Sequence, residues 1–176
     1  MLVRGYPLPM WRAALALLVA LSLSGPAAAG PFEDGVAAYA IGDYATVLSL
    51  WRPLAEQGHA EAQYNLAGMY EYGEGVPQDY AEAVRWYRLA AEKGDAYAQN
   101  NLGVSYYNGE GVPQDYVQAH MWFNLSASLQ TDAANRAEAV RNRRLVAAKM
   151  APEQIAEAQW LALVASETLA CVGSIE

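Results

Sequence analysis

The feature that most constrains this chain is an identical duplication. The octapeptide GEGVPQDY occupies residues 73–80 and again residues 109–116, 36 residues further along. A self-similar period of roughly 20 to 50 residues is typical of proteins built from stacked supersecondary units. Gly-x-Gly beside acidic residues suits either a phosphate or metal site or a tight turn. The flanking sequence decides between these two roles.

The residues around the octapeptide predict two helices in each unit. Residues 60–95 align with residues 96–131 at the same shift of 36. The first helix of each unit has an apolar or small residue at every fourth position, which is one face of an α-helix: Ala62, Leu66 and Tyr70, then Ala98, Leu102 and Tyr106. In the second helix a stripe runs from Tyr80 through Ala83 to Tyr87. We therefore expect a helical hairpin in each unit.

A shortened unit precedes these two. Residues 42–59 match the second half of a unit, but the octapeptide is missing before them, so we assign residues 30–59 to an N-terminal half repeat with a shorter turn. Trp86 and Trp122 recur at the period of 36 and are expected to fill the core.

Within the octapeptide, each residue type suits a turn between two helices. The first glycine is placed to end the first helix, and the second permits a tight reversal. Asp79 with Glu82, and Asp115 with Gln118, have the spacing of a capping box, in which the aspartate binds backbone amides and the later side chain reaches back. Gly58 is placed to end a second helix, as is Gly94 one unit later. A phosphate loop follows a strand and contains a lysine or a third glycine, so the turn is the preferred role.

At this point the residues resemble a known family. The pattern A-x-x-x-L-G/A-x-x-Y-x-x-G-x-G-V-P-x-D-x-x-x-A-x-x-W is similar to the Sel-one-like repeat, a relative of the tetratricopeptide repeat, and the resemblance covers residues 42–131. It implies an all-α, right-handed α-α solenoid that serves mainly as a protein-interaction scaffold. Several secreted bacterial members pair cysteines within each repeat, and some are linked to β-lactam binding. This chain has one cysteine, Cys171, which argues against carrying that activity over.

Residues 132–176 are interpreted as a degenerate repeat helix followed by a C-terminal cap helix. Pro152 suits the first turn of that last helix, although Ala151 before it provides no capping side chain. The expected buried stripe is Ile155, Ala158, Ala162, Ala165 and Leu169. A second apolar group lies beside this stripe, at Trp160, Leu161, Leu163 and Val164. Either the cap is deeply docked, or this second face binds a partner or another copy of the chain.

The first 29 residues are expected to be an export signal. Arg4 and Arg12 precede an apolar run at residues 13–23, and small residues follow this run up to Ala29. We expect cleavage after Ala29 and a periplasmic or secreted product, with no membrane insertion after cleavage. A start at Met10 would give a more compact signal.

The charge of the chain restricts its partners. The net charge is −8, and loss of the signal peptide removes two of the 11 basic residues and no acidic one, which leaves 9 against 19 and a net charge of −10. Nucleic acid is therefore not expected as a partner. Five of the remaining basic residues lie in one segment, which either folds back on the acidic repeats or contacts another copy: Arg136, Arg141, Arg143, Arg144 and Lys149.

Catalytic and metal motifs were not found in the sequence. His59 and His120 lie 61 residues apart, no nucleophile elbow or phosphate loop is present, and the acidic residues near the turns have structural explanations. We expect no catalytic residue, metal or cofactor.

Asn65 and Asn101 form the most informative polar repeat, because asparagine is a poor residue for a helix interior. In one interpretation, both side chains face a concave groove and hold an extended partner. In the other, they form a hydrogen-bond ladder between stacked units, and this ladder is the preferred interpretation. The candidate partner-binding residues are Tyr64, Asn65, Tyr72, Tyr97, Asn100, Asn101 and Tyr107. Tyrosine offers contact area and a hydroxyl at low entropic cost.

The sequence thus predicts an exported helical-repeat scaffold that binds another protein or peptide in the cell envelope. Its acidic surface is expected to attract basic partners, and weak self-association is possible. Two alternatives stay open: an envelope enzyme or a binder of cell-wall fragments of the β-lactam type, and a structural or regulatory subunit of a neighbouring protein.

Overall fold

The computed structural model describes residues 30–172, so the predicted signal peptide, residues 1–29, lies outside the described range, as do residues 173–176 and the side chain of Cys171. Eight α-helices and no strand make up the described range. They are α2 (Pro31–Ala40), α3 (Tyr44–Glu56), α4 (Ala60–Tyr72), α5 (Tyr80–Ala91), α6 (Ala96–Asn108), α7 (Tyr116–Leu129), α8 (Ala133–Ala147) and α9 (Pro152–Val172). None of these helices combines the length and apolar character that crossing a membrane requires.

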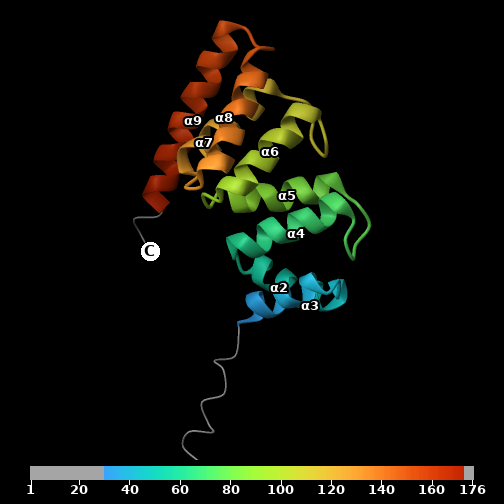
Figure 1. The fold of residues 1–176 in the computed structure, drawn as a ribbon. Coiled ribbons are helices and arrows are strands. Elements are labelled where there is room, and N and C mark those ends of the chain that lie inside the picture. Colours follow the sequence, from blue (N-terminus) through green and yellow to red (C-terminus); the bar gives the residue numbers. More distant parts are fainter. Residues whose placement is uncertain (1–29, 173–176) are drawn as a thin grey trace, which may run out of the picture.

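The helices form a stack of antiparallel hairpins (Figure 1). From α2 to α8, each helix packs chiefly on its neighbours along the chain, and α9 breaks the order by packing against α7. The hairpins are α2–α3, α4–α5 and α6–α7. The predicted all-α solenoid of helical hairpins is therefore confirmed.

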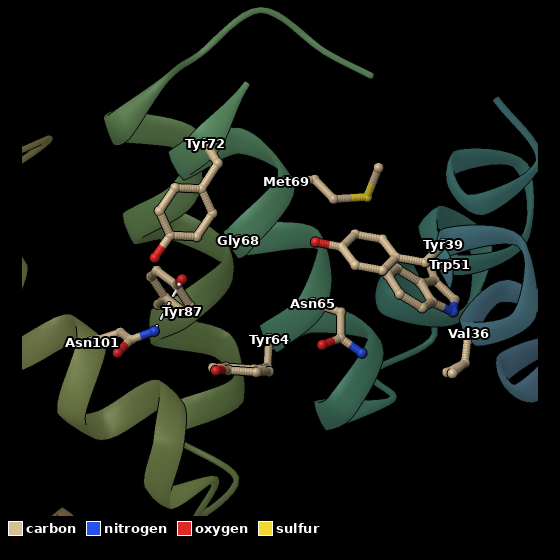
Figure 2. A pocket seen from close by; sticks show the side chains of 10 residues that line it. All are labelled: Val36, Tyr39, Trp51, Tyr64, Asn65, Gly68, Met69, Tyr72, Tyr87 and Asn101. Carbon is tan, nitrogen blue, oxygen red and sulfur yellow. Dashed lines mark hydrogen bonds between the residues drawn. The ribbon is translucent and has the colours of Figure 1, made fainter. Parts of the chain in front are cut away.

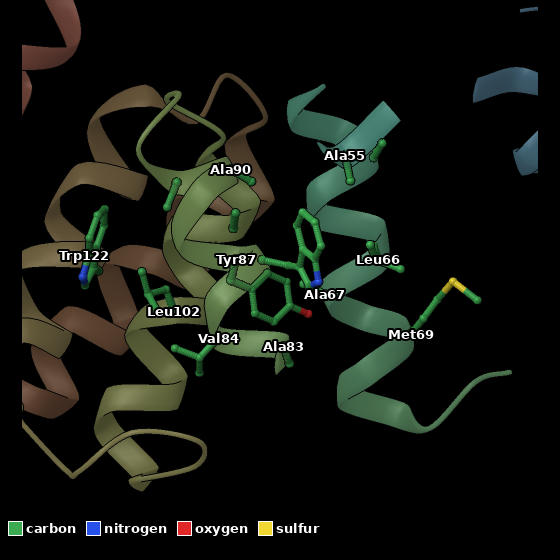
Figure 3. Close-up of a cluster of buried hydrophobic side chains, with 14 of the residues drawn as sticks. Ala55, Leu66, Ala67, Met69, Ala83, Val84, Tyr87, Ala90, Leu102 and Trp122 are labelled. Atoms are coloured by element: carbon green, nitrogen blue, oxygen red, sulfur yellow. The ribbon is translucent and has the colours of Figure 1, made fainter. Parts of the chain in front are cut away.

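The core is a continuous layer of buried side chains between the two helices of each hairpin and between successive hairpins (Figure 3). Leu66 and Leu102, one period apart, are fully buried, and so are the small residues that let the backbones approach. Gly103 is one such residue, since a Cβ there would lie 2.8 Å from the ring of Phe123. Trp86 and Trp122 are buried, which confirms their assignment to the core.

The two octapeptides form the turns between α4 and α5 and between α6 and α7. Gly73 and Gly109 end the first helices in the left-handed conformation, with φ of 73° and 78°. Gly75 and Gly111 both have φ of 71°. At Gly111 an added Cβ would overlap the backbone carbonyl of Tyr80, at the start of the preceding unit's second helix. The turn therefore also packs against the unit before it.

The predicted capping boxes are only half formed. The carboxylate of Asp79 accepts from the amides of Ala81 and Glu82, at 2.9 and 3.1 Å, and Asp115 accepts from the amide of Gln118. Glu82 does not reach back to the cap, because it forms an ion pair with Arg85 at 2.9 Å on the same helix.

In the last helix, α9, the predicted stripe is correct but the face beside it is not docked. Ala158 and Ala162 are buried against the core, and Leu161 is partly buried. Trp160 is 62% exposed and Leu163 57% exposed, and Val164 is exposed as well, so a fully docked cap is the wrong interpretation. The missing cap at Ala151 is replaced by Gln154, whose side-chain oxygen accepts from the Ala151 amide at 2.9 Å.

The basic segment does not fold back on the acidic repeats through ion pairs. Between residues 30 and 172 the single ion pair joins Glu82 and Arg85. Arg136 instead donates to the carbonyl of Gln130, and Arg143 donates to the side chain of Asn124. These contacts attach α8 to α7 and leave Arg141 and Arg144 exposed.

Candidate functional site

The largest concentration of predicted site residues surrounds one cavity of about 280 Å³, which we call the aromatic cavity (Figure 2). It lies where the first hairpin meets α4, α5 and α6. Its lining residues are Val36, Tyr39, Trp51, Tyr64, Asn65, Gly68, Met69, Tyr72, Tyr87 and Asn101. Aromatic rings with a few polar groups are the usual composition of a binding site.

Two tyrosine hydroxyls on the wall of the aromatic cavity are held by carboxylates. Tyr87 donates to Glu71 at 2.6 Å and accepts from the side-chain amide of Asn101 at 3.1 Å, which links α4, α5 and α6. Tyr39 of α2 donates to Glu74 in the first octapeptide turn, also at 2.6 Å. These bonds join the first hairpin and the turn to the repeats, and they orient both rings.

The asparagine ladder exists at only one of its two positions. Asn101 binds Tyr87, whereas the described residues offer no hydrogen bond to the side chain of Asn65. The cause lies one period earlier, because the residue equivalent to Tyr87 is Trp51, which has no hydroxyl and donates its indole N–H to the carbonyl of Phe32. The Asn65 amide therefore faces the aromatic cavity (Figure 2).

A second polar repeat, not recognised from the sequence, joins successive units instead. The side-chain amide of Gln63 donates to the carbonyl of Ala55 at 2.9 Å, and Gln99 donates to Ala91 at 3.1 Å. Both glutamines are buried and bind the end of the preceding helix. Their recurrence at 36 residues, in AEAQ and AYAQ, was the signal that could have found them.

The structure brings most, but not all, of the predicted site residues together. Tyr64, Asn65, Tyr72 and Asn101 line the aromatic cavity. Tyr97 and Asn100 line an adjoining cavity of about 120 Å³, which Asn101 shares. The rings of Tyr64 and Tyr97 lie 6.0 Å apart, so the two cavities are neighbours.

Tyr107 lies elsewhere and does not take part in either cavity. Its ring packs on Tyr116, and the ammonium group of Lys149 lies 4.5 Å from its centroid. It therefore helps attach the end of α8 to the second turn.

Sequence reasoning missed the side of the aromatic cavity formed by the first hairpin. Val36, Tyr39 and Trp51 belong to the half repeat, where the octapeptide is missing and the alignment is weakest. Gly68 was also missed. Its lack of a side chain keeps the α4 wall open, and an added Cβ would meet the Tyr87 hydroxyl at an ordinary contact of 3.8 Å.

The aromatic cavity lies in a negative electrostatic environment. The hydrogen bond to Glu74 raises the pKa of Tyr39 to about 12, and burial together with Glu71 raises the pKa of Tyr87. Burial and nearby carboxylates raise the pKa of Tyr64, and the charge of Glu71, with burial, raises that of Tyr72. All four hydroxyls stay protonated at neutral pH, and no basic residue lines the cavity.

The groups in the aromatic cavity are suited to binding, and neither histidine lines it. His59 caps α4 by accepting from the amide of Ala62, and His120 is buried in α7. Across residues 30–172 no three His, Cys, Asp or Glu side chains gather into a possible metal site. The groups that face the aromatic cavity supply ring surfaces, hydroxyls and one free amide.

Comparison with known proteins identifies the repeat. A family model described as Sel1 repeat matches residues 60–95 and 96–130. A curated relative from Rhizobium leguminosarum bv. viciae, described as an exopolysaccharide production negative regulator, is 37% identical over 79 residues, covering 37% of this chain and 30% of the relative.

Two solved structures share the fold. A protective antigen present in uropathogenic Escherichia coli strains, described as displaying an SLR fold, superposes with a TM-score of 0.71 at 28% identity, covering 83% of this chain and 32% of the antigen. A Sel1 repeat protein from Oxalobacter formigenes superposes with a TM-score of 0.54 at 25% identity, covering 67% of this chain and 55% of that protein. This chain thus spans under a third of the regulator and of the antigen.

Proposed function

Because this chain is a Sel1-like repeat protein, and such proteins are generally scaffolds for protein–protein interaction, we propose that it is an exported adaptor that binds an extended segment of another protein in the aromatic cavity. We assign it no catalysis of its own. The localisation, periplasmic or secreted after cleavage at Ala29, rests on the sequence of the first 29 residues.

One observation carries the proposal: the aromatic cavity presents an asparagine amide that no neighbouring side chain satisfies. The described residues give Asn65 no hydrogen-bond partner, while Asn101, its equivalent one period later, has one. A side-chain amide can donate to and accept from a peptide backbone at the same time. Around it, the accessible rings of Tyr39, Tyr64 and Tyr72 provide the contact surface that peptide recognition uses.

The relatives favour a regulatory form of this role. The matching protein from Rhizobium leguminosarum bv. viciae is described as a negative regulator, so a part of a regulator shares this repeat. A scaffold of this kind acts by holding another envelope protein, which is also the expected behaviour of a regulatory subunit.

Site-specific photocrosslinking tests the proposal. A photoreactive phenylalanine analogue replaces Tyr64 in the full chain expressed in its own host, and crosslinked proteins are identified by mass spectrometry. The matched control carries the analogue at Tyr107, outside both cavities. We expect a defined partner from position 64 and none from position 107.

The purified partner is then titrated against wild-type protein and Gly68→Val. Valine occupies the equivalent position, 104, in the next unit, so the helix tolerates it, while its methyl groups fill the aromatic cavity. We expect binding to fall at least about tenfold with an unchanged melting temperature. Equal crosslinking from position 107, or undiminished binding by Gly68→Val, would overturn the proposal. A melting-temperature rise with cell-wall muropeptides, lost in Gly68→Val, would instead point to a binder of cell-wall fragments.

A further inference from the structure

Two tyrosines of the aromatic cavity are hydrogen-bonded to carboxylates that have no ion-pair partner among the described residues. Two carboxylates, Glu71 and Glu74, bind the hydroxyls of Tyr87 and Tyr39 through one oxygen each. Among the described residues, no hydrogen bond engages the second oxygen, Oε1, of either glutamate. Neither glutamate is itself a lining residue, and no lysine, arginine or histidine lines the aromatic cavity, so the lining offers these carboxylates no positive charge.

Two arginines of the repeats are held at other places. Arg52 donates to the hydroxyl of Tyr70 at 3.2 Å, and Arg88, one period later, donates to Tyr106 at 2.7 Å. None of these four residues lines the aromatic cavity. The two carboxylates also contribute to the raised pKa values of Tyr39 and Tyr72, because a nearby negative charge favours the neutral phenol.

The walls suit a flat cation. Tyr39, which is 40% exposed, stacks on the buried Trp51 with an interplanar angle of 24° and a centroid distance of 5.8 Å, so Tyr39 supplies the accessible ring on the first-hairpin side. Tyr64 and Tyr72 form part of the opposite side (Figure 2). A guanidinium group stacks on such rings and can bind carboxylate oxygens through its outer nitrogens.

The chain already contains internal contacts of this type. The guanidinium carbon of Arg85 lies 4.0 Å from the ring centroid of Trp86, and Lys149 lies over Tyr107. The aromatic cavity differs from these two places because no cation is among its lining residues, while two of its tyrosines are hydrogen-bonded to carboxylates that lie beside the lining.

We propose that the aromatic cavity binds an arginine side chain of the partner's extended segment, with its guanidinium between the aromatic walls and close to Glu71 and Glu74, and with Asn65 binding the adjacent backbone. This inference rests on the proposed function, because it names the chemistry of the partner at the same site. It also explains how an acidic scaffold selects a position along a basic segment, since long-range attraction alone has no such selectivity.

The test uses three blocked peptides that differ only at the centre: Gly-Gly-Arg-Gly-Gly, the same peptide with citrulline, and the same peptide with lysine. Citrulline keeps the shape of arginine and removes its charge. Each peptide is titrated into isotope-labelled protein, and binding is read from the side-chain amide signal of Asn65 and the indole signal of Trp51. We expect arginine to bind more tightly than lysine, and at least about tenfold more tightly than citrulline.

Two variants test whether the charges of Glu71 and Glu74 cause the preference for arginine. Glu71→Gln combined with Glu74→Gln keeps acceptors for both tyrosine hydroxyls and removes both charges, so the preference for arginine over citrulline should disappear. Glu110→Gln is the matched control, because Glu110 occupies the position of Glu74 in the second octapeptide but binds Asn108 rather than a tyrosine of the aromatic cavity. It should bind like the wild type.

Equal affinity for arginine and citrulline, no response of Asn65 to any peptide, or full arginine preference in the double variant would each overturn the inference. Its failure can be distinguished from that of the proposed function. If the crosslinked partner is lost in Gly68→Val but bound normally by the Glu71→Gln, Glu74→Gln variant, the scaffold role holds and the arginine assignment fails. If the partner binds Gly68→Val normally, the aromatic cavity is not the site.

Discussion

At the scale of single residues, glycines with the same backbone conformation have different importance. Gly42 and Gly111 have φ of 74° and 71°, a region that costs other residues about 1–2 kcal/mol. Around Gly42 nothing approaches within 4 Å, whereas a Cβ at Gly111 would overlap the carbonyl of Tyr80. Gly111, the second glycine of the second octapeptide, is therefore required by the packing between units as well as by the conformation of its own turn.

This difference predicts unequal costs for the same substitution. Gly42→Ala should lower the free energy of unfolding by about 1 kcal/mol, the cost of the backbone conformation alone. Gly111→Ala should lower it by roughly 3 kcal/mol or more, because the turn must also move away from α5. Urea unfolding of both variants measures the two values. Equal losses would mean that the turn does not pack tightly on the preceding unit.

His120 predicts a pH dependence of stability. Burial, and then the positive charge of Arg143, lower its pKa below the usual 6.5. Below pH 6.5 the unfolded chain takes up a proton that the folded chain resists, so stability falls as the pH drops from 6.5 through the folded pKa. Thermal unfolding between about pH 7.5 and about pH 5.5 should show a larger loss for wild type than for His120→Val, which copies Val84 of the previous unit. Parallel pH profiles would contradict this assignment.

The residue scale also shows why part of the site could not be predicted. Asn65 and Asn101 have the same place in their units, yet only Asn101 has a partner, because the contacting residue changes from Trp51 to Tyr87. A pattern within one helix cannot show which side chain of another helix will face it. The tyrosines Tyr64 and Tyr72 were predictable, since they belong to the regular units, and Val36 and Tyr39 were not.

At the scale of elements, α9 shows how one helix can combine two kinds of surface. Ala158 and Ala162 pack against the core, which small residues permit, while Trp160 and Leu163 face outward. The spacing of the stripe was predictable from the sequence by helical periodicity. The exposure of the second face was not, because it depends on α9 packing mainly against α7 rather than entering another full hairpin.

Substitutions on the two faces of α9 should therefore differ. Trp160→Ala should change the free energy of unfolding of the monomer by no more than about 0.5 kcal/mol, since the side chain is 62% exposed. Ala162→Leu should lower it by about 1–3 kcal/mol, because the position is buried against the core and a larger side chain there forces its neighbours to shift. Chemical denaturation at two protein concentrations gives both values. A concentration-dependent loss in Trp160→Ala alone would show that this face joins two copies.

At the scale of the whole molecule, stability is a sum of neighbouring contacts. The first hairpin packs on the rest of the chain mainly by the contact of its α3 with α4. In addition, Tyr39 of α2 donates a hydrogen bond to Glu74. Such arrays open from their ends. The stack itself was predictable, because a period of 36 with helical stripes leaves few other folds, but the aromatic cavity lies at the junction where that period is broken.

We expect the first hairpin to open before the rest. Native-state hydrogen exchange should give lower opening free energies for amides in α2 and α3 than in α5 to α7. Tyr39→Phe should lower the protection of the first hairpin by about 1 kcal/mol, through loss of its hydrogen bond, and leave α7 unchanged. A uniform change along the chain would indicate a single cooperative unit.

The change of residue at one repeated position has a consequence for the proposed extended ligand. Positions 51, 87 and 123 are one period apart and hold Trp, Tyr and Phe, and only the first two line the aromatic cavity. A scaffold with identical units would let a bound strand slip by one unit and offer several equivalent positions. Among the described residues the combination occurs once, so under the proposed function we expect a partner strand to bind in one register and with a stoichiometry of one to one.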